Sequence, residues 1–296
     1  MTSNEQNPLK RFVKVRDVEE NYRIHVPDAP SDLPCRIAIA GMSLLSGKTN
    51  ALINLIGRPY DDSDPLKLYG DKFKPENIYL VSPTAAEEAK WREAFQEIEI
   101  PPGNLLPYDE PMLLELVKKI KEDYATAIAE GEKPPHVLVI MDDCTADGSM
   151  VSKRHGIMSK LASNLRHNNV STIVTAQKWT DIPPVFRNQC TGMMLGMLSP
   201  AELDDIWPAL AIPISKKEWL RVFEQGTFRT DEEGRMVPAA FLIHNPRNPP
   251  SKMFYTEDYK YIPWTTTSQE SKAPKRSRKQ PEQPQQQVPP QAAPTQ

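Results

Sequence analysis

The chain has 296 residues, a formal net charge of −3, and 39% hydrophobic and 25% charged residues. This composition is typical of one large globular domain with extensions or of two small domains. It excludes a protein that coats nucleic acid through overall positive charge, so any contact with DNA must be local. No apolar stretch approaches the roughly 20 residues of a membrane span, and the N-terminus lacks the form of a signal peptide. The three cysteines show neither a disulfide framework nor zinc spacing, which indicates a reducing compartment.

Residues 1–34 are polar and carry three prolines at their end. Alternating apolar residues between positions 12 and 26 predict one or two short strands. We expect this segment to be an N-terminal arm lying over the following domain, with a free linker as the alternative.

A P-loop is predicted next. The apolar strand 36–40 leads into a loop that ends in Gly47-Lys48-Thr49, and helical spacing follows to Ile56. Backbone N–H groups of such a loop point at phosphate oxygens. Lys48 supplies a positive charge along the phosphates, and the Thr49 hydroxyl supplies a ligand for Mg²⁺. The residues expected to bind ATP are Gly41, Ser43, Leu44, Leu45, Ser46, Gly47, Lys48, Thr49 and Asn50.

The P-loop departs from the usual pattern at one place. Five residues, not four, separate Gly41 from Gly47, and Met42 stands where the first glycine is expected. The alternative is a chance Gly-Lys-Thr at a helix start, but the strand before it and the helix after it favour the P-loop.

Further elements alternate between strand and helix. Residues 77–81 are apolar and partly β-branched and predict a second buried strand. Helical spacing follows at residues 85–98 and again at residues 112–129, where one face is apolar.

Residues 137–141 form a continuous apolar run, which is typical of a central parallel strand buried on both faces. Asp142 and Asp143 follow it directly, at the edge where α/β sheets bind ligands. We expect Asp142 to hold Mg²⁺ with its water shell and Asp143 to orient the attacking water as general base. The alternative is a pair of aspartates that cap a helix.

A fourth strand is predicted at residues 171–176, and it ends at Gln177. An amide at this position can bond both the γ-phosphate and the attacking water, although an ordinary loop glutamine is the alternative. The loop 144–158 before it carries a small basic cluster, Lys153, Arg154 and His155, and a helix is expected from there to His167.

The remaining elements are less strongly patterned. We expect a fifth strand at residues 190–198, helices at residues 200–207 and 215–225, and a closing hairpin. The hairpin strands would lie at Phe228 and at residues 239–243, with residues 231–234 as the turn. The C-terminal extension, residues 249–296, is expected to be disordered from about residue 265. Its basic run 272–279 is a nuclear-import signal, a weak nucleic-acid tether or a solubilising tail.

Three stretches together resemble the DNA-packaging ATPases of large eukaryotic DNA viruses, the poxvirus-type branch of the FtsK–HerA superfamily. They are residues 41–49, residues 137–144 with their Asp-Asp-Cys ending, and residues 166–177 with the following Asp181-Ile182-Pro183-Pro184 and Arg187. The likeness covers roughly residues 35–245, within an expected ATPase domain of residues 35–248.

The resemblance implies a fold and an assembly. The fold is α/β, a P-loop NTPase with a RecA-like, mostly parallel sheet flanked by helices on both faces. The assembly is a homo-oligomeric ring, a pentamer or hexamer, with ATP between subunits and an arginine supplied in trans. Arg166 and Arg187 are the candidates for that arginine, and a salt-bridged surface arginine is the alternative for each. Lys153, Arg154 and His155 are the candidates for gripping the DNA backbone.

The function expected from the resemblance is an ATP-driven, DNA-stimulated motor with Mg²⁺ as cofactor. It would move double-stranded viral DNA into a preformed capsid and contact capsid or portal-vertex proteins. It would act inside an infected cell, at the assembly site or in the nucleus, and associate with virions. The alternatives are a helicase-like DNA-remodelling ATPase and a nucleotide-binding capsid-assembly factor that does not hydrolyse ATP. A GTPase is disfavoured because no Asn-Lys-x-Asp motif appears.

Overall fold

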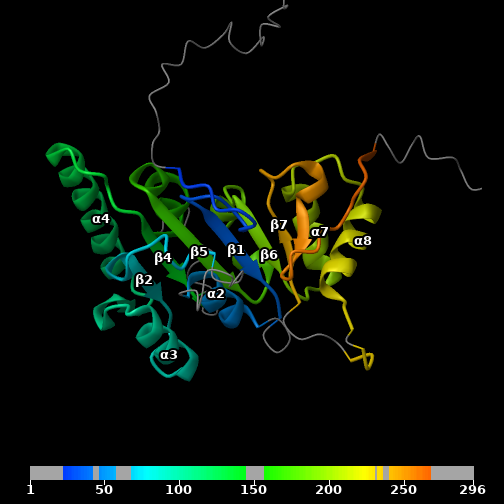
Figure 1. Cartoon of the computed structure of the whole chain (residues 1–296), viewed down its shortest axis with the longest axis horizontal. Helices are drawn as coiled ribbons and strands as arrows, with labels where there is room; N and C mark the ends of the chain where they lie inside the picture. Colours follow the sequence, from blue (N-terminus) through cyan, green and yellow to red (C-terminus); the bar gives the residue numbers. More distant parts are fainter. Residues whose placement is uncertain are drawn as a thin grey trace, which may run out of the picture.

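The computed structural model describes residues 23–42, 47–57, 68–144, 157–230, 232–235 and 240–267. Within them, eight strands form one sheet in the order β3-β2-β4-β5-β1-β6-β7-β8 (Figure 1). The strands are β1 Arg36–Ala40, β2 Ile78–Val81, β3 Leu105–Leu106, β4 Val137–Met141, β5 Val170–Ala176, β6 Gly192–Leu195, β7 Leu242–His244 and β8 Phe254–Thr256. The α-helices are α2 Lys48–Ile56, α3 Ala89–Ile98, α4 Glu110–Glu130, α5 Ile157–Ser159, α6 Pro184–Arg187, α7 Pro200–Ala209 and α8 Lys216–Thr227.

The sheet is mostly parallel. All pairings from β3 across to β6 are parallel, whereas β7 pairs antiparallel with both β6 and β8. Every residue of β1, β4 and β5 is buried. The continuous apolar runs of β1 and β4 in the sequence reflect this burial on both faces.

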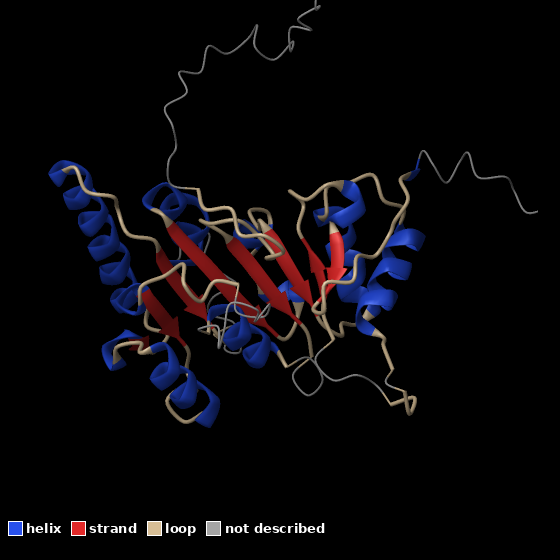
Figure 2. Ribbon diagram, viewed as in Figure 1, coloured by secondary structure: helices blue, strands red, loops and turns tan. Residues whose placement is uncertain are grey.

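Helices cover both faces of the sheet (Figure 2). Because successive strand residues point to opposite faces, Ile37 and Ile39 of β1 join a core with α2 and α3, while Ala38 and Ala40 join a core with α4, α7 and α8. The α/β, P-loop fold with a mostly parallel sheet is therefore confirmed.

The segment 23–34 packs against the sheet. Ile24 and Leu33 form an antiparallel bridge, and Leu33 is fully buried. The Tyr69 hydroxyl donates a 2.6 Å hydrogen bond to the Ser31 carbonyl oxygen. A Cβ atom on Gly192 of β6 would overlap the backbone of Pro30, so this glycine is what lets the segment approach the strand.

Several elements lie where the sequence predicts them. The bounds of β1, α2 and β4 match, and α4 and α8 extend the predicted helices by a few residues. The helix expected from residue 85 begins only at Ala89, and the fifth strand is shorter than expected, Gly192–Leu195. The helix expected to end at His167 is irregular: after α5, residues 160–164 form a wide π-helical turn and residues 165–168 a 3-10 turn.

The predicted closing hairpin is confirmed only in part: residues 242–243 of its second strand lie in β7, and residues 231 and 236–239 lie outside the described residues. Phe228 is not in a strand, because α8 continues to Thr227 and Phe228 caps its C-terminus, half-exposed. The hairpin instead consists of β7 and β8, with Ile243 opposite Tyr255. The sheet therefore extends beyond the domain boundary expected at residue 248. Among the described residues, no helix has the length and apolar character needed to cross a membrane.

Candidate active site

Three neighbouring strands deliver the P-loop and the acidic pair to one edge of the sheet. β5 lies between β1 and β4 and is parallel to both, so the carboxyl ends of all three strands meet. The N–H of Gly41 donates a 3.1 Å hydrogen bond to the carbonyl oxygen of Ala176, the last residue of β5. One strand over, the Asp142 N–H donates to Val81 O of β2 at 2.9 Å. This edge is where parallel α/β sheets bind ligands.

A cavity of about 150 Å³ lies at this edge. It is lined by Gly47, Lys48, Thr49, Asn50, Glu88, Lys90, Asp142, Asp143 and Thr175. The cavity therefore brings together four residues that the sequence predicts to bind ATP and the predicted acidic pair. The other three lining residues, Glu88, Lys90 and Thr175, have no predicted role.

Lys48 is buried at the base of this cavity, only 9% exposed, and its Nζ donates a 2.8 Å hydrogen bond to the Gly41 carbonyl oxygen. Burial lowers the pKa of Lys48, and the negative charges of Asp143 and Asp142 oppose that shift. An ammonium group held this way attracts the negative charge of a phosphate.

Gly47 precedes Lys48, the first residue of α2, with φ 54° and ψ 33°. This is the left-handed region, which glycine enters without steric cost. Lys48, Thr49 and Asn50, the first residues of α2, line the cavity, so the first turn of the helix lies at its edge, as at anion-binding helix N-termini.

Asp142 is 2% exposed and accepts three side-chain hydrogen bonds. The Thr175 hydroxyl donates to Oδ1 at 2.6 Å, while the Trp91 indole N–H and the Thr49 hydroxyl donate to Oδ2 at 2.9 and 3.3 Å. Burial raises the pKa of Asp142; the hydrogen bonds from Thr175, Trp91 and Thr49 counter the rise, and the nearby Glu88 charge adds to it.

Asp143 adopts a positive φ of 52°, and its N–H donates a 3.0 Å hydrogen bond to the Thr175 hydroxyl oxygen. Its Oδ1 is buried and has no hydrogen-bond partner in the described part of the chain. Buried carboxylate oxygens are rarely left without a partner, and Asp143 lines the cavity, so a ligand or a water molecule in the cavity would supply the partner.

The donor set fits a Mg²⁺ ion shared with a nucleotide. Thr49 Oγ1 and Asp142 Oδ2 lie 3.3 Å apart, and hard oxygen ligands are what Mg²⁺ prefers. Among the described residues no group of three or more His, Cys, Asp or Glu side chains forms a metal site by itself. Mg²⁺ in proteins is commonly held by one or two carboxylates together with substrate phosphates and water.

The other residues that the sequence predicts for this site either do not line the cavity or lie outside the described residues. Gln177 follows β5 directly, at the same edge, but its side chain is exposed and does not line the cavity. Two groups lie outside the described residues: Ser43, Leu44, Leu45 and Ser46 of the P-loop, and Lys153, Arg154 and His155 of the expected DNA contact.

Neither candidate arginine lines the cavity of its own chain. Arg166 precedes β5 and lies at the opposite, amino-terminal edge of the sheet, where it lines a different pocket. Arg187 ends α6; its guanidinium carbon lies 5.8 Å from the centre of the Trp179 ring, and its Nε is buried without a partner in the described residues.

Sequence reasoning missed Thr175, Trp91, Glu88 and Lys90. Thr175 lies two residues before Gln177, and the strand register places it beside Asp142, so the strand order would have revealed it. Trp91 comes from α3, 51 residues before Asp142, and nothing in the local pattern indicates that contact. Glu88 and Lys90 lie at the start of the same helix.

Comparison with solved structures finds viral and bacterial ATPases. The chain is similar to the genome packaging NTPase B204 of Sulfolobus turreted icosahedral virus 2 in complex with AMPPCP, with 14% identity, a TM-score of 0.45 and coverage of 79% of this chain and 99% of that chain. The ATP-gammaS complex of the same protein gives 13% identity, a TM-score of 0.46 and coverage of 80% and 100%. EssC (ATPases 2 and 3) from Geobacillus thermodenitrificans gives 14% identity, a TM-score of 0.45 and coverage of 72% and 38%.

These likenesses are too distant to assign a function, which has to be argued from the site. No curated protein matches the sequence. The family model described as "Poxvirus A32 protein" matches residues 31–238, which span the P-loop, the acidic pair and the strand that lies between them. The chain therefore belongs to the poxvirus A32 protein family.

Proposed function

We propose that this protein is an ATP-hydrolysing motor that moves double-stranded viral DNA into a preformed capsid. The observation that carries the proposal is the convergence of Lys48 and Thr49 with Asp142 and Asp143 in one cavity. Membership of the poxvirus A32 family and the genome-packaging role printed for the B204 relative agree with it.

The chemistry assigns one role to each group. Lys48 and the N–H groups around Gly47 would bind the β- and γ-phosphates and stabilise negative charge as the γ-phosphoryl group leaves. Thr49 and Asp142 would hold Mg²⁺, which neutralises charge on the phosphates when bound. Asp143, whose Oδ1 has no hydrogen-bond partner among the described residues, would orient the attacking water and accept its proton. Gln177 would assist from the end of β5.

The proposal includes a homo-oligomeric ring. Because Arg166 and Arg187 lie away from the cavity of their own chain, either could act only on the nucleotide of a neighbouring subunit. Capsid or portal-vertex proteins would anchor the ring, and Lys153, Arg154 and His155 would grip duplex DNA.

The test measures ATP hydrolysis with and without duplex DNA, on protein whose assembly state is determined in the same sample. Hydrolysis should rise when duplex DNA is added. Lys48→Ala and Asp142→Asn should each lower the rate on the order of 100-fold or more. The matched control Lys217→Ala changes an exposed lysine of α8 and should leave the rate unchanged.

Three results would overturn parts of this proposal. ATP binding without turnover would favour a nucleotide-binding assembly factor. Strand separation on a forked substrate would favour a helicase-like enzyme. Loss of activity in Lys48→Ala together with full activity in Asp142→Asn would contradict the assigned roles.

A further inference from the structure

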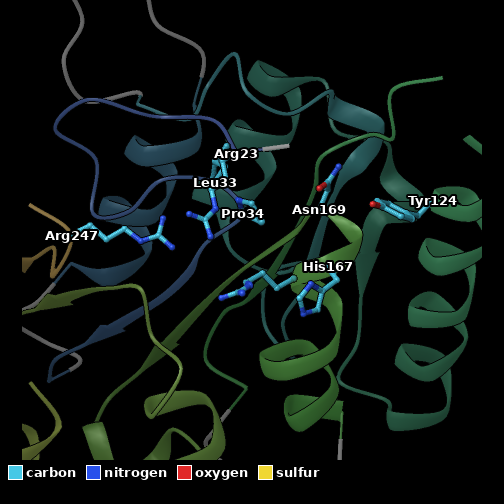
Figure 3. Close-up of a pocket in the computed structure, with 8 residues that line it drawn as sticks. Arg23, Leu33, Pro34, Tyr124, His167, Asn169 and Arg247 are labelled. Atoms are coloured by element: carbon cyan, nitrogen blue, oxygen red, sulfur yellow. The ribbon is translucent and has the colours of Figure 1, made fainter. Parts of the chain in front are cut away.

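A second, strongly basic pocket lies at the edge of the sheet opposite the Lys48 cavity (Figure 3). Its volume is about 170 Å³. It is lined by Arg23, Leu33, Pro34, Tyr124, Arg166, His167, Asn169 and Arg247. We refer to these eight residues as the arginine pocket.

The fold gathers these residues from separate parts of the chain. Leu33 and Pro34 precede β1, and Arg166, His167 and Asn169 precede β5, so both groups lie at the amino-terminal edge of the parallel strands. Because β7 runs antiparallel to β6, its carboxyl end reaches the same edge and places Arg247 there. Arg23 comes from the N-terminal segment and Tyr124 from α4.

Positive charge dominates the arginine pocket. Three of its eight lining residues are arginines, one is a histidine, and none is acidic. Figure 3 shows Arg23 and Arg247 extending into the same region from different segments. Arg36, the first residue of β1, is only 3% exposed, and its Nε donates a 2.7 Å hydrogen bond to the Gln189 carbonyl oxygen.

A carboxylate near Arg247 is shared with other groups. Asp32 approaches Arg247 at 3.7 Å, but the same carboxylate also accepts the N–H of Val26 and pairs with His25. Burial lowers the pKa of Arg36, and the positive charges of Arg166 and Arg247 lower it further. An anion in the pocket would relieve the repulsion between these charges.

The residue types favour a particular anion. Guanidinium groups donate paired N–H bonds that match the oxygens of phosphate, whereas lysine, absent from this lining, acts as a point charge. Leu33, Pro34 and Tyr124 add apolar surface to the lining.

We infer that the arginine pocket binds a phosphate group, as a second anion site separate from the Lys48 cavity. The phosphate would belong either to the DNA backbone or to a small phosphate-bearing molecule, and the experiment separates these sources. Only the DNA source rests on the proposed function, because a small-molecule site requires no motor activity.

The first arm uses inorganic phosphate and the Lys48→Ala protein, in which the P-loop no longer competes for phosphate. Phosphate is titrated while the thermal unfolding midpoint is followed, since a ligand that binds the folded state raises it in a saturable way. Arg23→Gln and Arg247→Gln, each added to Lys48→Ala, should weaken the apparent phosphate affinity about tenfold or more, as expected for loss of a charge-assisted hydrogen bond.

Arg235→Gln is the matched control, because Arg235 is also an exposed arginine with a carboxylate neighbour, Glu233 at 2.8 Å. Arg235→Gln should leave the phosphate affinity unchanged. It therefore separates specific binding in the pocket from the general stabilising effect of phosphate salts. Equal affinities in all four proteins, or stabilisation that does not saturate, would overturn the inference.

The second arm uses a short DNA duplex at several salt concentrations. If the DNA backbone is the source, Arg23→Gln and Arg247→Gln weaken duplex binding, and each reduces the salt slope by about 1. If phosphate affinity falls but duplex affinity does not, the source is a small phosphate-bearing molecule. Basal ATP hydrolysis in the same variants with Lys48 intact reports separately on the proposed function and should not change.

Discussion

Thr175 connects the two aspartates of the active site. Its hydroxyl donates a 2.6 Å hydrogen bond to Asp142 Oδ1, and the same oxygen accepts the N–H of Asp143 at 3.0 Å. One buried side chain on β5 therefore fixes both the proposed metal ligand and the backbone of the proposed general base.

Replacing Thr175 by valine keeps the shape of the side chain and removes both hydrogen bonds. Loss of a hydrogen bond to a carboxylate costs about 1.5–3 kcal/mol. We therefore expect Thr175→Val to lower kcat/KM for ATP by about 10- to 100-fold and to raise the Mg²⁺ concentration needed for half-maximal activity. Thr175→Ser keeps the hydroxyl and should retain most activity. Steady-state kinetics over a range of Mg²⁺ concentrations measures both, and equal rates for the valine and serine variants would refute the role of the hydroxyl.

The raised pKa of Asp142 predicts a conflict between stability and function. Because burial raises its folded-state pKa above the unfolded value of about 3.9, the folded state binds more protons than the unfolded state in the window between the two values. The contribution of Asp142 to stability is therefore complete below the unfolded pKa and is lost as pH rises through the folded pKa.

Asp142→Asn removes this dependence. At neutral pH the variant should be more stable than the wild type while being inactive, and the difference in stability should shrink as pH falls toward the unfolded pKa of the carboxyl group. Urea denaturation at several pH values measures the free energy of unfolding. A variant less stable than the wild type at neutral pH would show that the three hydrogen bonds outweigh the burial of the charge.

Gly192 tests the packing of the N-terminal segment on β6. A Cβ atom there would overlap the backbone of Pro30, which is not the mobile end of a side chain, so the segment would have to move. We expect Gly192→Ala to destabilise the protein by about 1–3 kcal/mol, as overpacking does. Gly103→Ala is the control, since no atom lies within 4 Å of a Cβ at that position. Equal unfolding midpoints for the two variants would mean that the segment does not pack as the structure has it.

The sequence predicts those parts of the fold and site that depend on residues close to one another along the chain. The apolar runs of β1 and β4, and the glycine, lysine and threonine after β1, follow from chemistry within a few residues. Parallel strands bring their carboxyl ends together, which is why the sequence predicts Lys48 and Asp142 at one edge of the sheet.

What the sequence could not predict depends on partners that are distant along the chain. The hydrogen bond from Trp91 to Asp142 and the approach of Arg247 to the segment before β1 arise only when the strands are ordered. The strand predicted at Phe228 is wrong because α8 continues to Thr227, and the pairing of β7 with β6 and β8 follows from the strand order, which the local pattern does not show.

The most direct measurement of the central claim compares ATP binding and ATP hydrolysis in the wild type and in Asp143→Asn. Asparagine keeps the size of the side chain but cannot accept a proton from water as a carboxylate does. The account predicts that the variant binds ATP with wild-type affinity and loses hydrolysis by about 100-fold or more. Wild-type hydrolysis in Asp143→Asn, with binding unchanged, would contradict the assignment of the acidic pair and with it the proposed chemistry of the cavity.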